Sequence, residues 1–186
     1  LLTDSIYGVI TNLYGTIVFE LRKQLDDFEF SQYLKVLLEA IDELKANTLD
    51  STDGLIGIGI GVYGIVSKSQ KITYATFTSW KDIDLKTIIE DYTGIETYVE
   101  NEANISALGE HLAHPDDQNL ISLNIGHGVG MGIIIDHKLY SGEHGYAGEI
   151  GHNIIVPNGK KCVCGNYGCL EQYISEPALL DDYYQK

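Results

Sequence analysis

Basic residues, proline and long apolar runs are all scarce in this chain of 186 residues. It has 12 lysines and arginines against 27 acidic residues, for a formal net charge of -15. Such an excess of negative charge repels nucleic-acid phosphates, so the chain itself is not expected to bind DNA or RNA. No apolar run approaches the length of a membrane span, and no basic region followed by an apolar one marks a signal peptide. These absences predict a soluble cytoplasmic protein without membrane partners.

Cysteine is also scarce, and its placement is informative. All three cysteines, Cys162, Cys164 and Cys169, lie within eight residues, and His152 precedes the first by ten positions. Three thiols and an imidazole are the four ligands that a closed tetrahedral zinc site needs. Full disulfide pairing is excluded by the odd count, and a Cys-x-Cys bridge is strained. The spacing favours zinc, with a reduced structural cysteine cluster as the alternative.

Hydrophobic periodicity alternates between strand and helix patterns along the chain, which predicts an α/β fold. The first two strands should pair as a hairpin, since turn residues separate them. Gly94 should end the second helix in the left-handed conformation. The expected strands are residues 6–13, 17–21, 55–62 and 96–100, and the expected helices are residues 31–47, 84–92 and 103–112.

A polar break over residues 114–118 precedes a strongly apolar strand that begins at Leu120. Because domain boundaries fall in polar segments, we expect a first lobe over residues 1–116 and the start of a second over residues 117–186.

Two segments suggest binding chemistry but leave alternatives open. Asn101 and Glu102 follow a predicted strand, at the end where α/β sheets place ligands, although Asn101 could simply cap the next helix and Glu102 favour its dipole. The glycine-rich residues 126–132 are not a dinucleotide fingerprint, because a strand and not a helix follows them. They are interpreted equally well as a hairpin or as a loop whose N–H groups face phosphate.

The segment over residues 145–152, Gly-Tyr-Ala-Gly-Glu-Ile-Gly-His, is followed by Cys-Val-Cys-Gly-Asn-Tyr-Gly-Cys-Leu-Glu at residues 162–171. This pair resembles the signature of the ROK family of repressors, open reading frames and sugar kinases. The resemblance implies a two-lobed, actin-like ATPase (ribonuclease-H-like) fold, with the second lobe incomplete here. It also implies a structural Zn²⁺ bound by His152, Cys162, Cys164 and Cys169.

The same resemblance implies a sugar site. Residues 100–104 resemble the Asn-Asp-Ala-Asn sugar corner of the family, in which the aspartate is the general base of the kinases; Glu102 stands at that position. Carboxylates and amides can each engage two sugar hydroxyls, which gives orientation. Plain solvent exposure is the alternative for the two later glutamates. The implied sugar-binding residues are Asn101, Glu102, Glu149, His152 and Glu171.

Three departures from the kinase pattern distinguish a sensor from an enzyme. One is Glu102 in place of the aspartate base, and the other two lie in the phosphate loops. Leu1 and Leu2, followed by Thr3, stand where the kinases have a Gly-Gly-Thr phosphate loop, and a Cβ there obstructs phosphate. In the second phosphate loop, residues 126–128, His127 replaces threonine. Both loops therefore look degenerate, with no catalytic residue retained beyond Glu102 at the base position.

These features predict the effector domain of a ROK-type transcriptional repressor, closest to the xylose-responsive ones. It would bind a monosaccharide, possibly xylose or glucose, and reach DNA only through a helix-turn-helix domain absent from this chain. A homodimer or homotetramer is expected. The alternatives are an ATP-dependent sugar kinase of the glucokinase or fructokinase type, and a zinc-stabilised scaffold that binds neither ligand.

Overall fold

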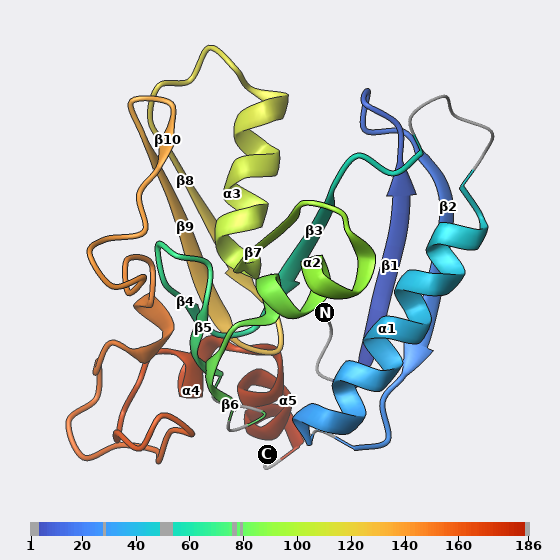
Figure 1. Ribbon diagram of the computed structural model, residues 1–186. Helices are drawn as coiled ribbons and strands as arrows, with labels where there is room; N and C mark the ends of the chain where they lie inside the picture. Colours follow the sequence, from blue (N-terminus) through green and yellow to red (C-terminus); the bar gives the residue numbers. More distant parts are fainter. Residues whose placement is uncertain (1–3, 28, 49–53, 76–77, 79, 185–186) are drawn as a thin grey trace. The chain divides into compact units, whose positions relative to one another are not determined.

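The computed structural model describes residues 4–27, 29–48, 54–75, 78 and 80–184 (Figure 1). Strands and helices are mixed along the chain, as the α/β prediction requires. The chain divides into two compact units: unit 1 comprises residues 1–64 and 69–100, and unit 2 comprises residues 65–68 and 101–186. Among the described residues, no helix is long and apolar enough to cross a lipid bilayer.

Unit 1 begins with the predicted hairpin. Strand β1 (Ser5–Thr11) pairs antiparallel with β2 (Ile17–Gln24), with Gly8 opposite Leu21. The side chain of Asn12 organises the turn, because its Oδ1 accepts hydrogen bonds from two backbone N–H groups at 2.9 and 3.0 Å. Local turn chemistry therefore fixes the register of this pair.

Helix α1 (Phe30–Ala46) lies against this hairpin, as Figure 1 shows. Its apolar residues recur at three- and four-residue intervals and form one buried stripe, as the sequence pattern predicts. Trp80 makes an edge-to-face aromatic contact with Tyr33 of this helix, and the two ring centroids are 4.4 Å apart. The buried residues of the stripe are Tyr33, Leu37, Ala40 and Ile41.

The rest of unit 1 alternates short strands with one helix. β3 pairs with β7, and β5 with β6. The helix α2 begins after Asp84, whose Oδ1 accepts from the N–H of Thr87 at 3.2 Å, and ends at Gly94 with φ of 70°, so the predicted stop is confirmed. The elements are β3 (Ile58–Val62), β5 (Ile72–Ala75), β6 (Trp80–Ile83), α2 (Leu85–Thr93) and β7 (Thr97–Asn101).

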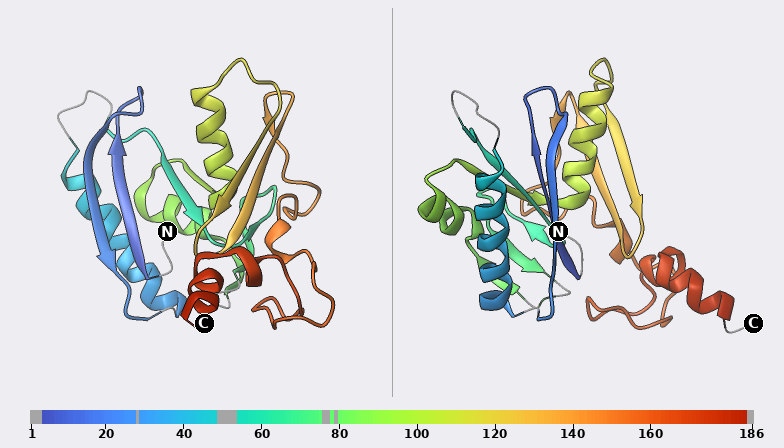
Figure 2. Two further views of the ribbon diagram at one scale, coloured as in Figure 1. Left: turned by 180° about the vertical axis from the view of Figure 1, so that it is seen from behind. Right: turned by 90° about the vertical axis from the view of Figure 1, so that its right-hand side faces the viewer.

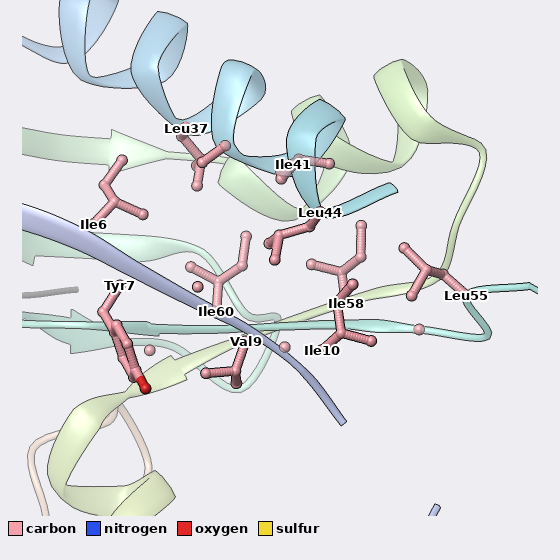
Figure 3. A pocket seen from close by; sticks show the side chains of 15 residues that line it. Ile6, Tyr7, Val9, Ile10, Leu37, Ile41, Leu44, Leu55, Ile58 and Ile60 are labelled. Atoms are coloured by element: carbon pink, nitrogen blue, oxygen red, sulfur yellow. The ribbon is translucent and has the colours of Figure 1, made fainter. Parts of the chain in front are cut away.

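A pocket of about 190 Å³ lies within unit 1 among β1, β3 and α1 (Figure 3). Its lining side chains are aliphatic apart from Tyr7, whose hydroxyl donates to Glu20 at 2.5 Å. Sugar sites need convergent polar groups to orient hydroxyls. This pocket lacks them, so the candidate functional site must be sought elsewhere.

Unit 2 is built on a second antiparallel hairpin, β8 (Leu120–Ile125) and β9 (Val129–Ile135), with Ile125 opposite Val129. The glycine-rich residues 126–132 therefore form the turn and most of β9, as the hairpin interpretation expected. The short β10 (Lys138–Leu139) pairs with the far end of β9. Unit 2 also contains β4 (Ile65–Val66), the 3-10 helix η1 (Ile150–His152), α4 (Glu171–Ile174) and α5 (Glu176–Tyr184).

Helix α3 (Glu102–Ala113) crosses one face of this hairpin, as Figure 2 shows. Small residues permit the close approach, because Ala103 and Ala107 face Gly132. This contact also explains a difference from the sequence analysis, which put α3 in the first lobe and the boundary at residues 116 and 117. In the structure α3 belongs to unit 2, and the polar break is only its connection to β8.

We expect Gly132→Ala to destabilise the protein by about 1–3 kcal/mol, because the new methyl group would overlap the carbonyl oxygen of Ala103. The matched control is Gly109→Ala on α3, where a methyl group meets nothing within 4 Å. That change should instead stabilise the helix by about 0.5–1 kcal/mol. Urea unfolding curves measure both. Equal effects of the two substitutions would contradict this account of α3 packing.

Candidate functional site

The four residues proposed as metal ligands converge in unit 2. One ligand atom from each of His152, Cys162, Cys164 and Cys169 lies within 4.8 Å of all the others. Nδ1 of His152 is 3.5 Å from Sγ of Cys162, and the sulfur atoms of Cys164 and Cys169 are 3.7 Å apart. All three thiols are free, and two of them are buried.

These distances fit a tetrahedral zinc ion. Zn–S bonds of about 2.3 Å and Zn–N bonds of about 2.0–2.1 Å imply S···S separations of roughly 3.8 Å and S···N separations of roughly 3.6 Å. Burial and the neighbouring thiols raise the pKa of Cys169 to about 12, so the thiol is neutral by itself. A divalent cation reverses that preference and deprotonates coordinating thiols. The four residues are thus positioned to hold a metal.

A loop over residues 153–168 brings the ligands together by doubling back on itself. Isolated bridges pair Ile154 with Cys169 and Lys161 with Tyr167. Tyr173 on α4 supports the loop from outside: its hydroxyl accepts the N–H of Lys160 at 2.9 Å, and the Lys160 ammonium lies 5.4 Å from its ring centroid. This role of Tyr173 could not be predicted from the sequence, because no spacing pattern connects Tyr173 to the loop.

Three carboxylates lie in the same unit as the four candidate ligands. Glu149 immediately precedes η1, Glu171 begins α4 two residues after Cys169, and Glu102 begins α3. Glu171 is only 7% exposed, so simple solvent exposure, the alternative for the two later glutamates, does not apply to it. A buried carboxylate requires hydrogen-bond donors, and the N–H of Val129 supplies one at 3.3 Å.

The other two carboxylates act electrostatically on Glu149. Burial raises the pKa of Glu149; attraction to His152 opposes this rise, while repulsion from Glu102 and Glu171 adds to it. Burial likewise raises the pKa of Glu102, against hydrogen bonding to the N–H of Ala103. Three partly or fully buried carboxylates can together accept several hydrogen bonds from a polyhydroxyl ligand.

Two glycines hold the segment that carries Glu149 and His152. Gly148 has φ of 90°, and a Cβ there would overlap the carbonyl oxygen of Met131. At Gly151 a Cβ would overlap the carbonyl oxygen of Val129. The backbone of this segment therefore lies directly against β9, which a side chain at either position would prevent. The repeat of glycine every third residue was the available signal in the sequence.

The structure places the remaining predicted residues as follows. Asn101 caps α3, because its Oδ1 accepts from the N–H groups of Ala103 at 2.8 Å and Asn104 at 3.2 Å, so the capping interpretation is confirmed. Its sugar role stays a prediction and would fall to the amide nitrogen. His127 is exposed in the turn between β8 and β9. Leu1, Leu2 and Thr3 lie outside the described residues.

The α/β architecture and the histidine–cysteine loop define the class of protein. The chain belongs to the ROK family, which it matches over residues 6–186, and it has the actin-like ATPase fold of that family. Both regulators and sugar kinases occur among its relatives.

Sequence relatives include the xylose repressor of Bacillus subtilis (strain 168), 41% identical over 185 residues, or 98% of this chain and 48% of that protein. The glucokinase of Streptomyces coelicolor is 40% identical over 129 residues, or 68% of this chain and 41% of that protein. The chain spans about half the length of the curated relatives it matches.

Solved structures give the same two groups. A ROK family transcriptional regulator, described as a homolog of the E. coli MLC protein, superimposes with a TM-score of 0.86 at 30% identity, covering 98% of this chain and 47% of that chain. The glucokinase of Streptomyces griseus, solved with glucose and AMPPNP, gives a TM-score of 0.88 at 29% identity and covers 100% of this chain and 58% of that chain.

The raised pKa of Glu149 predicts a pH-dependent stability cost. The folded state holds this proton more tightly than the unfolded state, so the cost is absent below the ordinary pKa of 4.5, grows as pH rises from 4.5 to the folded pKa, and is constant above it. Glu149→Gln should therefore raise the melting temperature at pH 7, with a gain that shrinks toward pH 5. Differential scanning calorimetry from pH 5 to pH 8 measures this trend.

The control is Glu143→Gln in the same segment. The pKa of Glu143 is lowered by its exposed ion pair with Lys68, so the sign is reversed and no gain at neutral pH is expected. A gain for Glu149→Gln that is constant with pH would contradict the assignment to ionisation.

Proposed function

We propose that this chain is the sugar-sensing effector domain of a ROK-type transcriptional repressor. Its ligand would be a monosaccharide, with xylose and glucose as the first candidates. The observation that carries the proposal is the cluster of Glu102, Glu149 and Glu171 beside His152, the imidazole of the candidate metal centre. DNA would be bound by a helix-turn-helix domain outside these residues, in keeping with the net charge of -15.

The chemistry of the cluster suits a sugar. Each sugar hydroxyl both donates and accepts, and a carboxylate can accept from two neighbouring hydroxyls. Burial of Glu102 and Glu149 strengthens such bonds by reducing competition from water. The amide of Asn101 would add a donor.

A bound Zn²⁺ would have a structural role and fix the orientation of the histidine ring. Nδ1 of His152 faces the thiol of Cys162, so a metal at the four ligands would leave Nε2 to contact a sugar hydroxyl. The same loop ends at Cys169, two residues before Glu171. Metal binding would therefore constrain two sugar-binding side chains at once.

A sensor is favoured over a kinase by the identity of two residues. Glu102 has one methylene more than the aspartate expected of a kinase base, and a misplacement of about 1 Å can cost about a hundredfold in rate. His127 replaces the threonine expected in the second phosphate loop. Similarity to the B. subtilis xylose repressor, which extends over 98% of this chain, supports the same choice. As a sensor, the protein must bind sugar more tightly in one operator-binding state than in the other.

The second candidate function is ATP-dependent sugar phosphorylation. A carboxylate is retained at Glu102, and burial raises its pKa toward the range in which a general base works at neutral pH. Similarity to the glucokinase of Streptomyces coelicolor supports this second candidate.

Isothermal titration calorimetry of the full-length protein with xylose and glucose tests sugar binding. The parent should bind at least one of the two, and Glu149→Gln should weaken binding about tenfold or more because it removes a charged hydrogen-bond acceptor. Glu143→Gln, which changes an exposed residue of the same segment, should leave affinity unchanged. No heat with a broad panel of hexoses and pentoses would refute the sensor and leave the scaffold function.

A coupled assay with ATP and the same sugars separates the two candidate functions. A sensor should show no phosphorylation. Turnover at about 1 per second or faster, within the ordinary range of enzymes, would establish the kinase and overturn the sensor proposal.

Elemental analysis by inductively coupled plasma mass spectrometry tests the metal. The purified protein should contain one zinc ion per chain, and His152→Ala should lose it, because one of four ligands is removed. The matched control is His144→Ala, an exposed histidine of the same segment, which should retain zinc. Zinc retained equally by both variants would contradict the ligand assignment.

A further inference from the structure

The turn between β8 and β9 reaches the candidate site through one side chain, that of Glu171. A Cβ added to Gly128 would lie 2.8 Å from Oε2 and 3.8 Å from Cδ of this glutamate. The next residue, Val129, donates its N–H to the same Oε2 at 3.3 Å. The turn thus supplies both the space and a hydrogen bond for a carboxylate that comes from α4, 42 residues after Val129.

The backbone of Gly128 does not require glycine. Its φ lies outside the left-handed region, which L residues rarely adopt, so an alanine fits the local conformation. What an added methyl group meets is the tip of the Glu171 side chain, which is 7% exposed. The glycine therefore matters for the neighbouring carboxylate and not for the turn itself.

The other glycines of the hairpin serve different purposes. A Cβ at Gly126 meets nothing within 4 Å. At Gly130 it would approach Cβ of Ala103 at 2.9 Å, and at Gly132 it would overlap backbone of α3. Within the hairpin, the steric contact with the Glu171 carboxylate is specific to Gly128.

We propose that Gly128 is a positioning residue for sugar binding: it holds open the space in which the Glu171 carboxylate bonds to Val129 and points at the ligand. This inference rests on the proposed sugar-sensing function. It gives the glycine-rich turn a role in carbohydrate recognition in place of phosphate binding. An added methyl group meets only the end of a flexible side chain, so it can displace the carboxylate without moving backbone, and the cost in stability is limited to the long 3.3 Å bond with Val129. Affinity and stability should therefore separate.

The test compares two alanine substitutions in the full-length protein. Gly128→Ala should weaken binding of xylose or glucose, whichever the parent binds, about tenfold or more, since a charged hydrogen-bonding group is misplaced. Its melting temperature and zinc content should stay near those of the parent. Gly126→Ala, two residues away with open space around it, should change none of the three quantities. Unchanged affinity in Gly128→Ala would overturn the proposal.

A double-mutant cycle with Glu171→Ala distinguishes positioning from a general effect of the turn. Once the carboxylate is gone, Gly128→Ala has nothing to displace and should cause no further loss of affinity. An equal loss in the parent and in the Glu171→Ala background would refute the role of Gly128, because the effect would then not pass through Glu171.

A crystal structure of the Gly128→Ala variant gives an answer that does not depend on sugar binding. The Glu171 carboxylate should have left the N–H of Val129. A carboxylate that keeps this bond would overturn the inference whatever the affinity. A displaced carboxylate in a protein whose parent binds no sugar would support the steric role and count against the proposed function alone.

Discussion

The candidate site depends on direct backbone contact between the segment of residues 145–152 and strand β9. At Gly148 and Gly151 this contact leaves no room for a Cβ, because the carbonyl oxygens of Met131 and Val129 lie directly against the two glycines. Contact at this distance fixes Glu149 and His152 relative to the sheet. The same strand bonds to Glu171 through Val129, so β9 is the common reference for three of the proposed sugar ligands.

Burial of the three carboxylates near β9 has an electrostatic cost that the fold offsets only in part. Glu171 has an amide donor, and Glu102 starts a helix, where a negative charge is favourable. Glu149 has the attraction of His152 but feels both other carboxylates. A ligand rich in hydroxyl donors would offset this repulsion by donating hydrogen bonds to the carboxylates.

The convergence of His152 with the three cysteines could be predicted from sequence because the spacing is local: three cysteines within eight residues leave few other arrangements. The end of helix α2 at Gly94 could also be predicted from sequence, since it depends on the left-handed conformation of one glycine. The placement of α3 was not, because the contact of Ala103 with Gly132 joins segments far apart in the chain. Likewise the bond between Val129 and Glu171 spans 42 residues, and no periodicity reports it.

The backbone contacts at Gly148 and Gly151 also bear on how this site can diverge among relatives. Tyr146 projects outward and is exposed, so mutation can alter it without shifting the acidic residue that follows Gly148. Substitution of surrounding surface residues could then change the preference of the proposed sugar site, while the Glu149 carboxylate and the His152 imidazole keep their positions. Close backbone contact would keep Glu149 and His152 in position while exposed residues such as Tyr146 are substituted. Such an arrangement allows new ligand specificities to evolve on one scaffold.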